Sequence, residues 1–231
     1  MRLDKLLANM GYGTRNEVRK LCRERRVAVN GTIVTKSDAK VDEEKDTVTL
    51  DGVPVLYEKY TYFMLNKPAG FISATEGNEP VVMDLITEGI KGLFPCGRLD
   101  KDTTGLLLIT NDGDLAHALL SPKNNVEKEY LVGTEKPVTE SDIRKLAQGI
   151  TIDGGVVCKP ADCIPVNEKT CRLIIREGKF HEVKRMLEAL DNRVVTLKRL
   201  RMKTLVLDET LAEGEYRPLT EEEIASLRGS E

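Results

Sequence analysis

The sequence contains little of several residue types on which common enzyme classes depend. It has no Trp, four Phe and two His among 231 residues. With so few aromatic side chains, a packed core must be built mainly from aliphatic residues. His117 and His181 are the only histidines, so a histidine-activated nucleophile and a zinc site are both poorly supported.

Other absences exclude further classes. The five cysteines form no closely spaced pair, which favours reduced thiols over a disulfide framework. Neither GxxxxGK[ST] nor GxGxxG occurs, so nucleotide hydrolysis and dinucleotide binding have no support. No apolar run reaches the roughly 18 residues that a membrane span requires, and the N-terminus is charged where a signal peptide is apolar. We therefore expect a soluble cytoplasmic protein.

Charge is distributed unevenly along the chain, whose net charge is −3. Residues 1–36 contain nine Lys/Arg and three Asp/Glu, a net charge of +6, and residues 176–203 carry +5. Residues 208–231 form an acidic tail of net charge −6. Phosphate contacts are local, and salt screens charges beyond about 10 Å, so clustered charge is more informative than the total. The clusters predict a polyanionic partner on one face.

Residues 1–58 are predicted to form a first, small domain. Apolar residues at helical spacing from Leu3 to Met10 predict one helix, and Thr14 is a suitable N-cap for a second. Two β-branched runs within Val27–Val34 flank Asn30-Gly31, a strong hairpin signal. A linker is expected near residues 56–61.

The second helix of this domain is strongly basic. A charged helix more commonly has a face that is simply solvated. Residues 15–26, however, contain six bases and two acids, Glu17 and Glu24, and this excess of positive charge favours RNA binding. The segments Arg2–Lys5, Thr14-Arg15 and Val27–Gly31 resemble the αL (S4-like) RNA-binding module of a small-subunit ribosomal protein and some tRNA synthetases. The predicted RNA-binding residues are Arg2, Lys5, Arg15, Arg19, Lys20, Arg23 and Arg26.

Residues 59–231 are predicted to form a second domain. Short strands outnumber helices and do not alternate strictly with them, so we expect an α+β fold with a largely antiparallel mixed sheet. Thr139–Asp142 predicts a capping box that opens a helix. One face of a later helix is predicted to carry Phe180, Val183, Met186, Leu187 and Leu190.

A polar loop, Gly97–Gly105, leads directly into the apolar run Leu106–Thr110. Such a loop can hold a carboxylate rigidly at the edge of a sheet, where functional residues often lie. Asp100 and Asp102 are therefore candidates for a site. They are equally compatible with ordinary turn residues that accept hydrogen bonds from nearby backbone amides.

Four motifs in this domain resemble those of one family. Gly97–Asp100 followed by Thr103–Leu106 is similar to the signature loop of RsuA-type pseudouridine synthases, which modify ribosomal RNA. Three further blocks agree in order and spacing: Leu65–Gly70, Lys128–Tyr130 and Gly178–Met186. With the αL module in front, the resemblance covers nearly the whole chain.

Within that family, Phe180–Met186 and Glu215–Thr220 are most similar to the small-subunit enzyme. The resemblance thus implies action on U516 of 16S ribosomal RNA. A large-subunit enzyme of the same family is the main alternative. Ribosomal RNA, free or in an assembly intermediate, is the expected partner of a monomer that does not associate with membranes.

The resemblance also implies residue roles. Asp100 is the carboxylate that acts on ribose or base, either as a nucleophile or by removing a sugar proton. Tyr130 stacks on the target uracil, an interaction worth roughly 1–3 kcal/mol. Arg98 enters the gap left by the flipped base. Lys184 is the basic partner of Asp100, and its neighbour Arg185 is expected to bind substrate phosphate.

Pseudouridine formation breaks the glycosidic C–N bond, turns the uracil and rejoins it through C5. No atom is gained or lost, so the resemblance implies no metal and no cofactor. Lys67-Pro68 is expected to support the loop, and His181 receives no role. Two other classes stay open: a non-catalytic RNA-binding ribosome-assembly protein, and a nucleoside glycosidase that uses Asp100 with Asp102.

Overall fold

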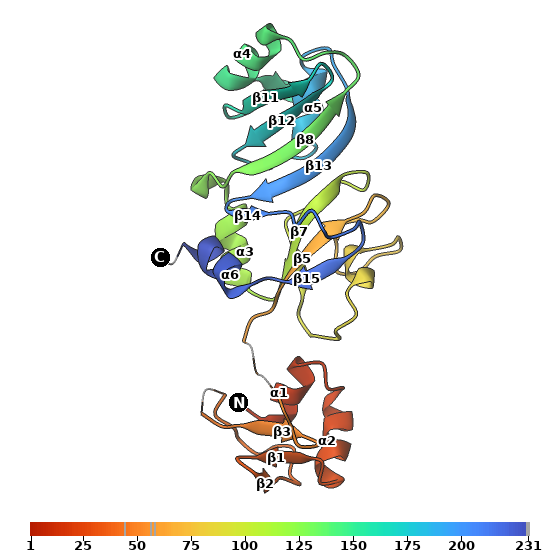
Figure 1. Cartoon of the computed structure of the whole chain (residues 1–231), viewed down its shortest axis with the longest axis vertical. Helices are drawn as coiled ribbons and strands as arrows, with labels where there is room; N and C mark the ends of the chain where they lie inside the picture. The colour runs from red at the N-terminus through yellow and green to blue at the C-terminus, as the bar shows by residue number, and fades with distance from the viewer. Residues whose placement is uncertain (44, 56, 58, 230–231) are drawn as a thin grey trace. The chain divides into compact units, whose positions relative to one another are not determined.

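The computed structural model describes residues 1–43, 45–55, 57 and 59–229. They form two compact units (Figure 1). The N-terminal unit comprises residues 1–61 with 86–93, and the main unit comprises the rest. The predicted boundary between residues 58 and 59 stays a prediction, because residues 56 and 58 of the expected linker lie outside the described residues. No helix in the described part is long and apolar enough to span a membrane.

The N-terminal unit packs two helices against a small sheet. Its elements are α1 (Leu3–Asn9), α2 (Arg15–Arg23), β1 (Val27–Val29), β2 (Thr32–Ile33), β3 (Val48–Leu50) and β4 (Val53–Pro54), with strand order β2-β1-β3-β4. The predicted N-cap is confirmed: Thr14 Oγ1 accepts from Glu17 N, and Glu17 closes a capping box. Asn30 and Gly31 both have positive φ, so the predicted hairpin is confirmed as well.

A nine-stranded sheet dominates the main unit. Its strands are β5 (Tyr62–Lys67), β6 (Phe94–Cys96), β7 (Thr104–Thr110), β8 (Lys128–Thr134), β11 (Asp162–Asn167), β12 (Thr170–Ile175), β13 (Val194–Met202), β14 (Leu205–Val206) and β15 (Tyr216–Pro218). The main path runs β11-β12-β8-β13-β7-β5-β15, with β14 on β13 and β6 on β7. Among the described strands of this sheet only β13 and β7 pair in parallel, which confirms the α+β class. Strands β5 and β7 are buried along their length and form the aliphatic core.

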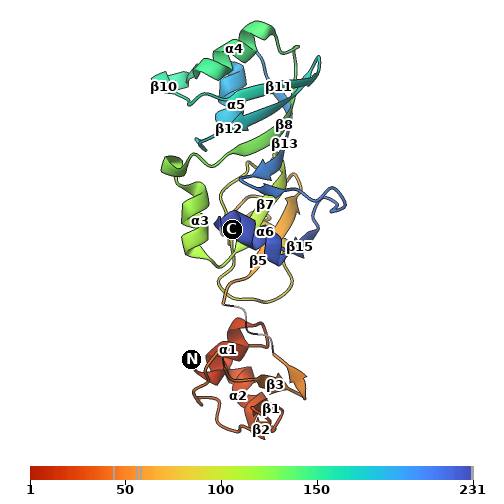
Figure 2. The ribbon, with the colours of Figure 1, turned by 60° about the vertical axis from the view of Figure 1, so that its left-hand side comes forward.

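Helices lie beside both ends of this sheet (Figures 1 and 2). They are α3 (Gly113–Leu120), α4 (Glu140–Gln148), α5 (Glu182–Glu188) and α6 (Glu221–Arg228), while β9 (Thr151–Ile152) and β10 (Val156–Val157) form a separate two-stranded ribbon. The predicted capping box is confirmed, since Thr139 Oγ1 accepts from Asp142 N. Helix α4 contacts β11, and α5 contacts β13.

One helix prediction was wrong at its start. Phe180 does not belong to the buried face of α5, because α5 begins at Glu182 and its N-cap, His181, has a left-handed backbone with φ of 48°. Phe180 therefore precedes the helix, with 67% of its surface exposed. Leu190 follows the last residue of α5.

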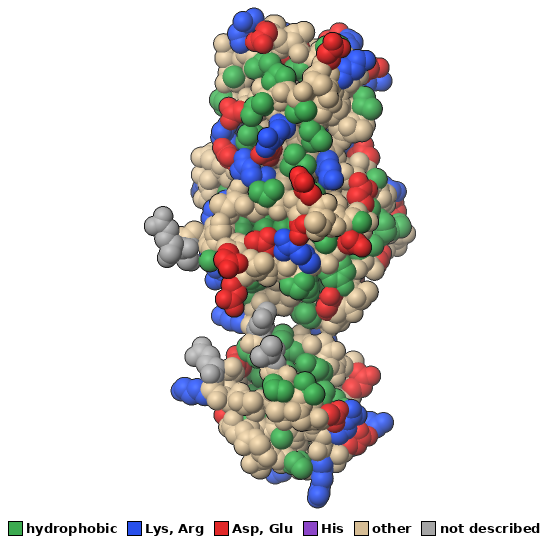
Figure 3. All heavy atoms as spheres, viewed as in Figure 1, with side chains coloured by type: hydrophobic (Ala, Val, Ile, Leu, Met, Phe, Trp, Pro, Cys, Tyr) green, Lys and Arg blue, Asp and Glu red, His purple; other side chains and the backbone are tan. Residues whose placement is uncertain are grey.

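The acidic C-terminal segment is folded onto the main unit. Arg217 in β15 pairs with Asp208 (2.7 Å) and with Glu223 of α6 (2.8 Å). Arg228 pairs with buried Asp112 at 2.6 Å, and Tyr62 Oη donates to the same carboxylate. The face drawn in Figure 3 intermixes acidic and basic side chains over the main unit. The acids of this segment therefore act partly as internal partners of arginines.

Candidate active site

The loop Gly97–Thr103 joins β6 to β7 and presents Asp100. Gly105 in β7 has a φ of +97°, and a Cβ there would lie 2.3 Å from a backbone oxygen of β13, so glycine permits the close approach of the two strands. Ser73 Oγ donates to Leu99 O and accepts from Leu99 N, both at 3.0 Å. The loop is thereby fixed at its strand end and along one side.

Lys67 supports the same loop from beneath. It is completely buried, and its Nζ donates to three carbonyl oxygens, those of Pro68 (3.0 Å), Lys101 (3.4 Å) and Thr103 (2.8 Å). Burial lowers the pKa of Lys67 to about 8, although Asp100 and other nearby carboxylates act to raise it. These contacts agree with the supporting role expected for Lys67-Pro68.

Lys184 of α5 bridges two carboxylates of the loop. Its Nζ lies 3.0 Å from Asp100 Oδ2 and 2.6 Å from Asp102 Oδ1. Burial alone would lower the pKa of Lys184, but its hydrogen bonds to Asp102 and Asp100 raise it above the ordinary value. The same ammonium lowers the pKa of Asp102. The structure thus brings together the predicted pair, Asp100 and Lys184, and adds Asp102 as a third member.

His181 also lies beside the loop. Its Nε2 is 3.5 Å from Asp100 Oδ1, and its ring stacks on Phe180 with centroids 3.8 Å apart and an interplanar angle of 19°. The sequence left His181 without a role and predicted Phe180 on one face of a helix together with Val183 and Met186. The available signal was the spacing of His181 and Lys184, which are three residues apart and both reach Asp100.

A cavity of about 660 Å³ surrounds this constellation. Its lining includes Arg98, Asp100, Tyr130 and Lys184, four of the residues predicted for the site. Tyr130 is buried on β8, whereas Arg98 is exposed. The volume lies in the range of ordinary small-ligand pockets. The cavity can therefore receive one planar base beside a half-buried carboxylate.

Arg185 does not line this cavity. Its Nε pairs with Asp153 Oδ1, and its two other guanidinium nitrogens donate to Phe180 O and Asp153 O, each at 3.1 Å. In this structure Arg185 holds the turn before α5, and its predicted phosphate contact stays a prediction.

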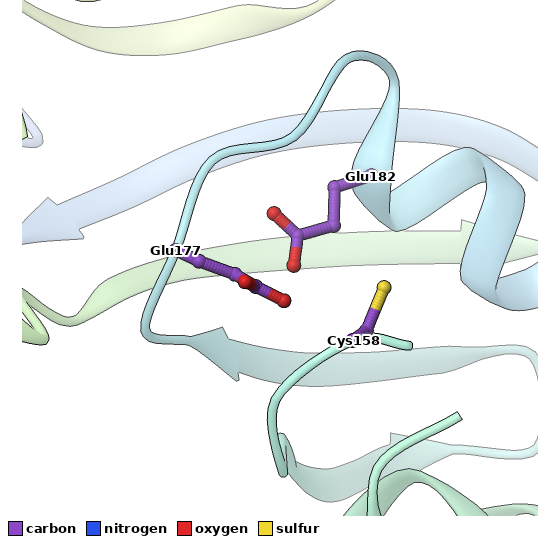
Figure 4. Close-up of side chains that lie close together, drawn as sticks. All are labelled: Cys158, Glu177 and Glu182. Carbon is purple, nitrogen blue, oxygen red and sulfur yellow. The ribbon is translucent and has the colours of Figure 1, made fainter. Parts of the chain in front are cut away.

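A buried cluster of Cys158, Glu177 and Glu182 lies at the start of α5 (Figure 4). Its sulfur and carboxylate oxygens lie within 4.8 Å of one another, a spacing that a metal ion could use. The Lys179 ammonium, however, already pairs with Glu177, which also accepts from Lys159 N at 2.7 Å. Burial and the neighbouring Glu177 raise the pKa of Glu182 to about 7. The arrangement suits two carboxyl groups that share a proton better than a cation site.

The seven basic residues predicted to bind RNA are all exposed in the N-terminal unit. Three have acidic partners: Arg2 with Asp4, Lys20 with Glu24, and Arg26 with Asp51. Among the described residues, no ion pair engages the others, Lys5, Arg15, Arg19 and Arg23. The last three lie on α2 and leave several positive charges available to a polyanion.

Comparisons with known proteins agree with this geometry. The model of the RNA pseudouridylate synthase family matches residues 61–189, and that of the S4 domain matches residues 1–55. The chain is 48% identical to an uncharacterised RNA pseudouridine synthase of Bacillus subtilis, over 97% of each chain. It is 42% identical to ribosomal small subunit pseudouridine synthase A of Escherichia coli, over 98% of this chain and all of that protein. A crystal structure of a pseudouridylate synthase superimposes with a TM-score of 0.71 at 40% identity, over 98% of this chain and 99% of the other.

Proposed function

Because the chain belongs to the RNA pseudouridylate synthase family, we propose that its substrate is 16S ribosomal RNA and its target is U516. The full-length similarity to ribosomal small subunit pseudouridine synthase A of several bacteria supports this choice. The S4 domain and its exposed cations support a large RNA substrate, one that extends beyond the part bound in the cavity.

The observation that carries the chemical part of the proposal is the ion pair of Asp100 and Lys184 inside the cavity. A uridine flipped out of its helix inserts its base against Tyr130, which brings C1′ and the glycosidic nitrogen to Asp100. Entry of the base removes water from Asp100, so the negative charge of its carboxylate then depends on partners within the protein. The Lys184 ammonium, 3.0 Å from Asp100 Oδ2, stabilises that charge.

Catalysis then proceeds in three stages. The C1′–N1 bond breaks with Asp100 acting on the ribose, the uracil rotates while held in the cavity, and C5 forms the new bond to C1′. The proton on C5 leaves, and N1 gains one, so the atoms balance without an added reactant. We further propose that the protein works as a cytoplasmic monomer, on free ribosomal RNA or on an assembly intermediate.

The test is to incubate the protein with unmodified 16S RNA and, separately, unmodified 23S RNA, each alone or bound by ribosomal proteins, and to map pseudouridine by carbodiimide-blocked primer extension. A new stop at U516, with unchanged RNA mass, is the expected result. A stop in 23S RNA instead would assign the enzyme to the large subunit. Release of free uracil would indicate a glycosidase, and binding without either change would indicate an assembly protein.

A further inference from the structure

Two buried cations lie on the wall of the cavity, apart from the Asp100–Lys184 pair. Lys128 and Tyr130 are two residues apart on β8, so their side chains share one face of the sheet. Arg199 on β13 lies directly opposite Tyr130 in the strand register. Lys128 and Arg199 are 7% and 2% exposed, and both line the cavity. Strand pairing thus places a lysine and an arginine around the tyrosine predicted to stack on the uracil.

On the opposite face of the sheet, cations are paired with a carboxylate. There Glu129 is almost completely buried and pairs with both Arg172 and Arg201. On the cavity face, no ion pair engages Lys128 or Arg199 among the described residues. Among the described residues, the sheet therefore pairs its arginines with a carboxylate on one face and leaves two cations without an ion-pair partner on the other.

The hydrogen bonds of the two cavity cations are also incomplete. Lys128 Nζ donates to Val126 O (3.1 Å), and Arg199 Nε donates to Leu106 O (2.7 Å). Arg199 Nη2 is buried and has no hydrogen-bond partner among the described residues. Burial and the neighbouring Arg199 lower the pKa of Lys128. A buried donor without an acceptor is costly, so an acceptor supplied by a ligand would relieve that cost.

Glu182 also lines the cavity and acts electrostatically on Lys128, but among the described residues it forms no ion pair with Lys128 or Arg199. Its oxygen Oε2 accepts from Lys179 N at 2.8 Å, and its pKa is raised to about 7, so near neutral pH it is partly protonated. Positive charge consequently dominates this part of the cavity.

We propose that Lys128 and Arg199 form a subsite for the carbonyl oxygens of the flipped uracil and stabilise the negative charge that develops on the base during glycosidic cleavage. This inference rests on the proposed function. Asp100, on the loop, is the group that meets the ribose, so the base attached to C1′ extends inward over Tyr130. Its O2 and O4 are acceptors, which suit lysine and arginine donors, whereas cytosine presents an amino group in place of O4.

The electron balance of cleavage explains why cations are useful there. When the C1′–N1 bond breaks, its electron pair stays on N1 and delocalises onto O2 and O4 of the uracil. This holds whether Asp100 then bonds to C1′ or a sugar proton is removed. Donors fixed in advance where charge develops, in a site shielded from water, commonly change rates by about 10²–10³-fold. The charge disappears when C5 bonds to C1′, and the C5 proton is then replaced by one on N1, so the base stays neutral.

The experiment measures single-turnover cleavage at saturating RNA for Lys128→Met and Arg199→Met. Each variant is assayed on RNA with uridine and on RNA with 5-fluorouridine at the target. Fluorine withdraws electrons and makes the base a better leaving group, so cleavage of 5-fluorouridine should depend less on the two cations. Cleavage is followed by the loss of uridine or 5-fluorouridine from nuclease digests. Lys198→Met is the matched control, because the Lys198 side chain lies on the opposite face of β13 from Arg199.

We expect Lys128→Met and Arg199→Met each to break the glycosidic bond of the uridine substrate about 10²-fold more slowly than wild type. The defect should shrink several-fold with 5-fluorouridine, while RNA affinity and the Lys198→Met rate stay near wild type. An equal defect on both substrates would overturn the proposal and assign the cations to folding or positioning. If Arg199→Met unfolds, Lys128→Met and Arg199→Lys carry the same test. Failure of the proposed function is distinct, since the wild-type protein would then leave both substrates unchanged.

Discussion

The N-terminal unit and the main unit use positive charge in opposite ways. On α2, Arg15, Arg19 and Arg23 are exposed and have no ion-pair partner among the described residues. Around the cavity, Lys184 is mostly buried and bridges two carboxylates. Exposed charges attract phosphate over a distance and lose strength with salt, whereas buried charges are screened little and set protonation states. We therefore predict that the N-terminal unit contributes mainly to RNA affinity and the main unit to chemistry.

The largest expected effect comes from removing the negative charge of Asp100 in the main unit. Asp100→Asn should lower single-turnover pseudouridine formation on the order of 10⁴-fold or more, as removal of a central catalytic group does. RNA affinity should be unchanged, because the residues predicted to contact phosphate lie elsewhere. Asp102→Asn is the control: this residue shares Lys184 but its side chain is 72% exposed, and we expect less than about a tenfold loss. Equal losses in the two variants would mean that Asp100 has no special role.

A smaller effect, dependent on pH, is expected from Lys184→Met. Without the ammonium, the negative charge of Asp100 in the RNA-filled cavity loses its ion-pair partner, so activity should fall most at acidic pH. A close cation lowers a carboxylate pKa by about 1–3 units, so the loss at acidic pH should be about 10–10³-fold and should diminish at alkaline pH. The measurement is the single-turnover rate against pH at saturating RNA. Lys184→Arg should be impaired less, and a pH-independent loss would show that Lys184 only positions RNA.

Arg185→Met tests whether the ion pair has been assigned to the right neighbour. Arg185 pairs with Asp153 and not with the loop carboxylates. We therefore expect a pH profile like that of wild type. If Arg185→Met lost activity at acidic pH and Lys184→Met did not, Arg185 and not Lys184 would be the partner of Asp100.

Glu182→Gln should affect stability more than catalysis. The folded-state pKa of Glu182 is about 7, above its ordinary value of 4.5, so the contribution of this group to wild-type stability falls as pH rises from about 4.5 through 7. Glutamine removes this penalty. The difference in unfolding free energy between the variant and wild type should therefore favour the variant more at pH 8 than at pH 5. The change between the two pH values should be roughly 1–3 kcal/mol, since one pKa unit corresponds to about 1.4 kcal/mol. Urea titrations at both pH values would show it, and a gain that does not depend on pH would argue against the buried carboxyl pair.

The smallest effect belongs to single cations of the N-terminal unit. Arg19→Ala should weaken RNA binding only a few-fold and lower the dependence of log Kd on log salt by about one. Arg26→Ala, whose guanidinium already pairs with Asp51 at 2.6 Å, should change the slope less. Filter binding at several salt concentrations makes the measurement. Identical slopes for wild type and Arg19→Ala would place this helix face in solvent.

Local features of both units could be predicted from the sequence because short-range chemistry determines them. Asn30-Gly31 predicted a hairpin, and Thr14 and Thr139 predicted helix starts. The family resemblance pointed to Asp100, Tyr130 and Lys184, and the fold brings these residues to one cavity. Their catalytic roles stay predictions.

Features that depend on long-range pairing could not be predicted in this way. The opposition of Arg199 and Tyr130 follows from the register between β8 and β13, which periodicity does not specify. The exposed position of Phe180 depends on one left-handed residue, His181, that interrupts an apparently helical apolar pattern. The neighbourhood of Glu177 and Glu182 likewise arises only when the turn before α5 folds back.

Catalysis by Asp100 at U516 is tested most directly by quantitative pseudouridine mapping in cells that lack this gene and are complemented with either wild type or Asp100→Asn. We expect the deletion to abolish the modification, wild type to restore it fully, and Asp100→Asn, expressed at the same level, to restore none. Persistence of pseudouridine at U516 in the deletion strain, or its restoration by Asp100→Asn, would contradict the proposed function.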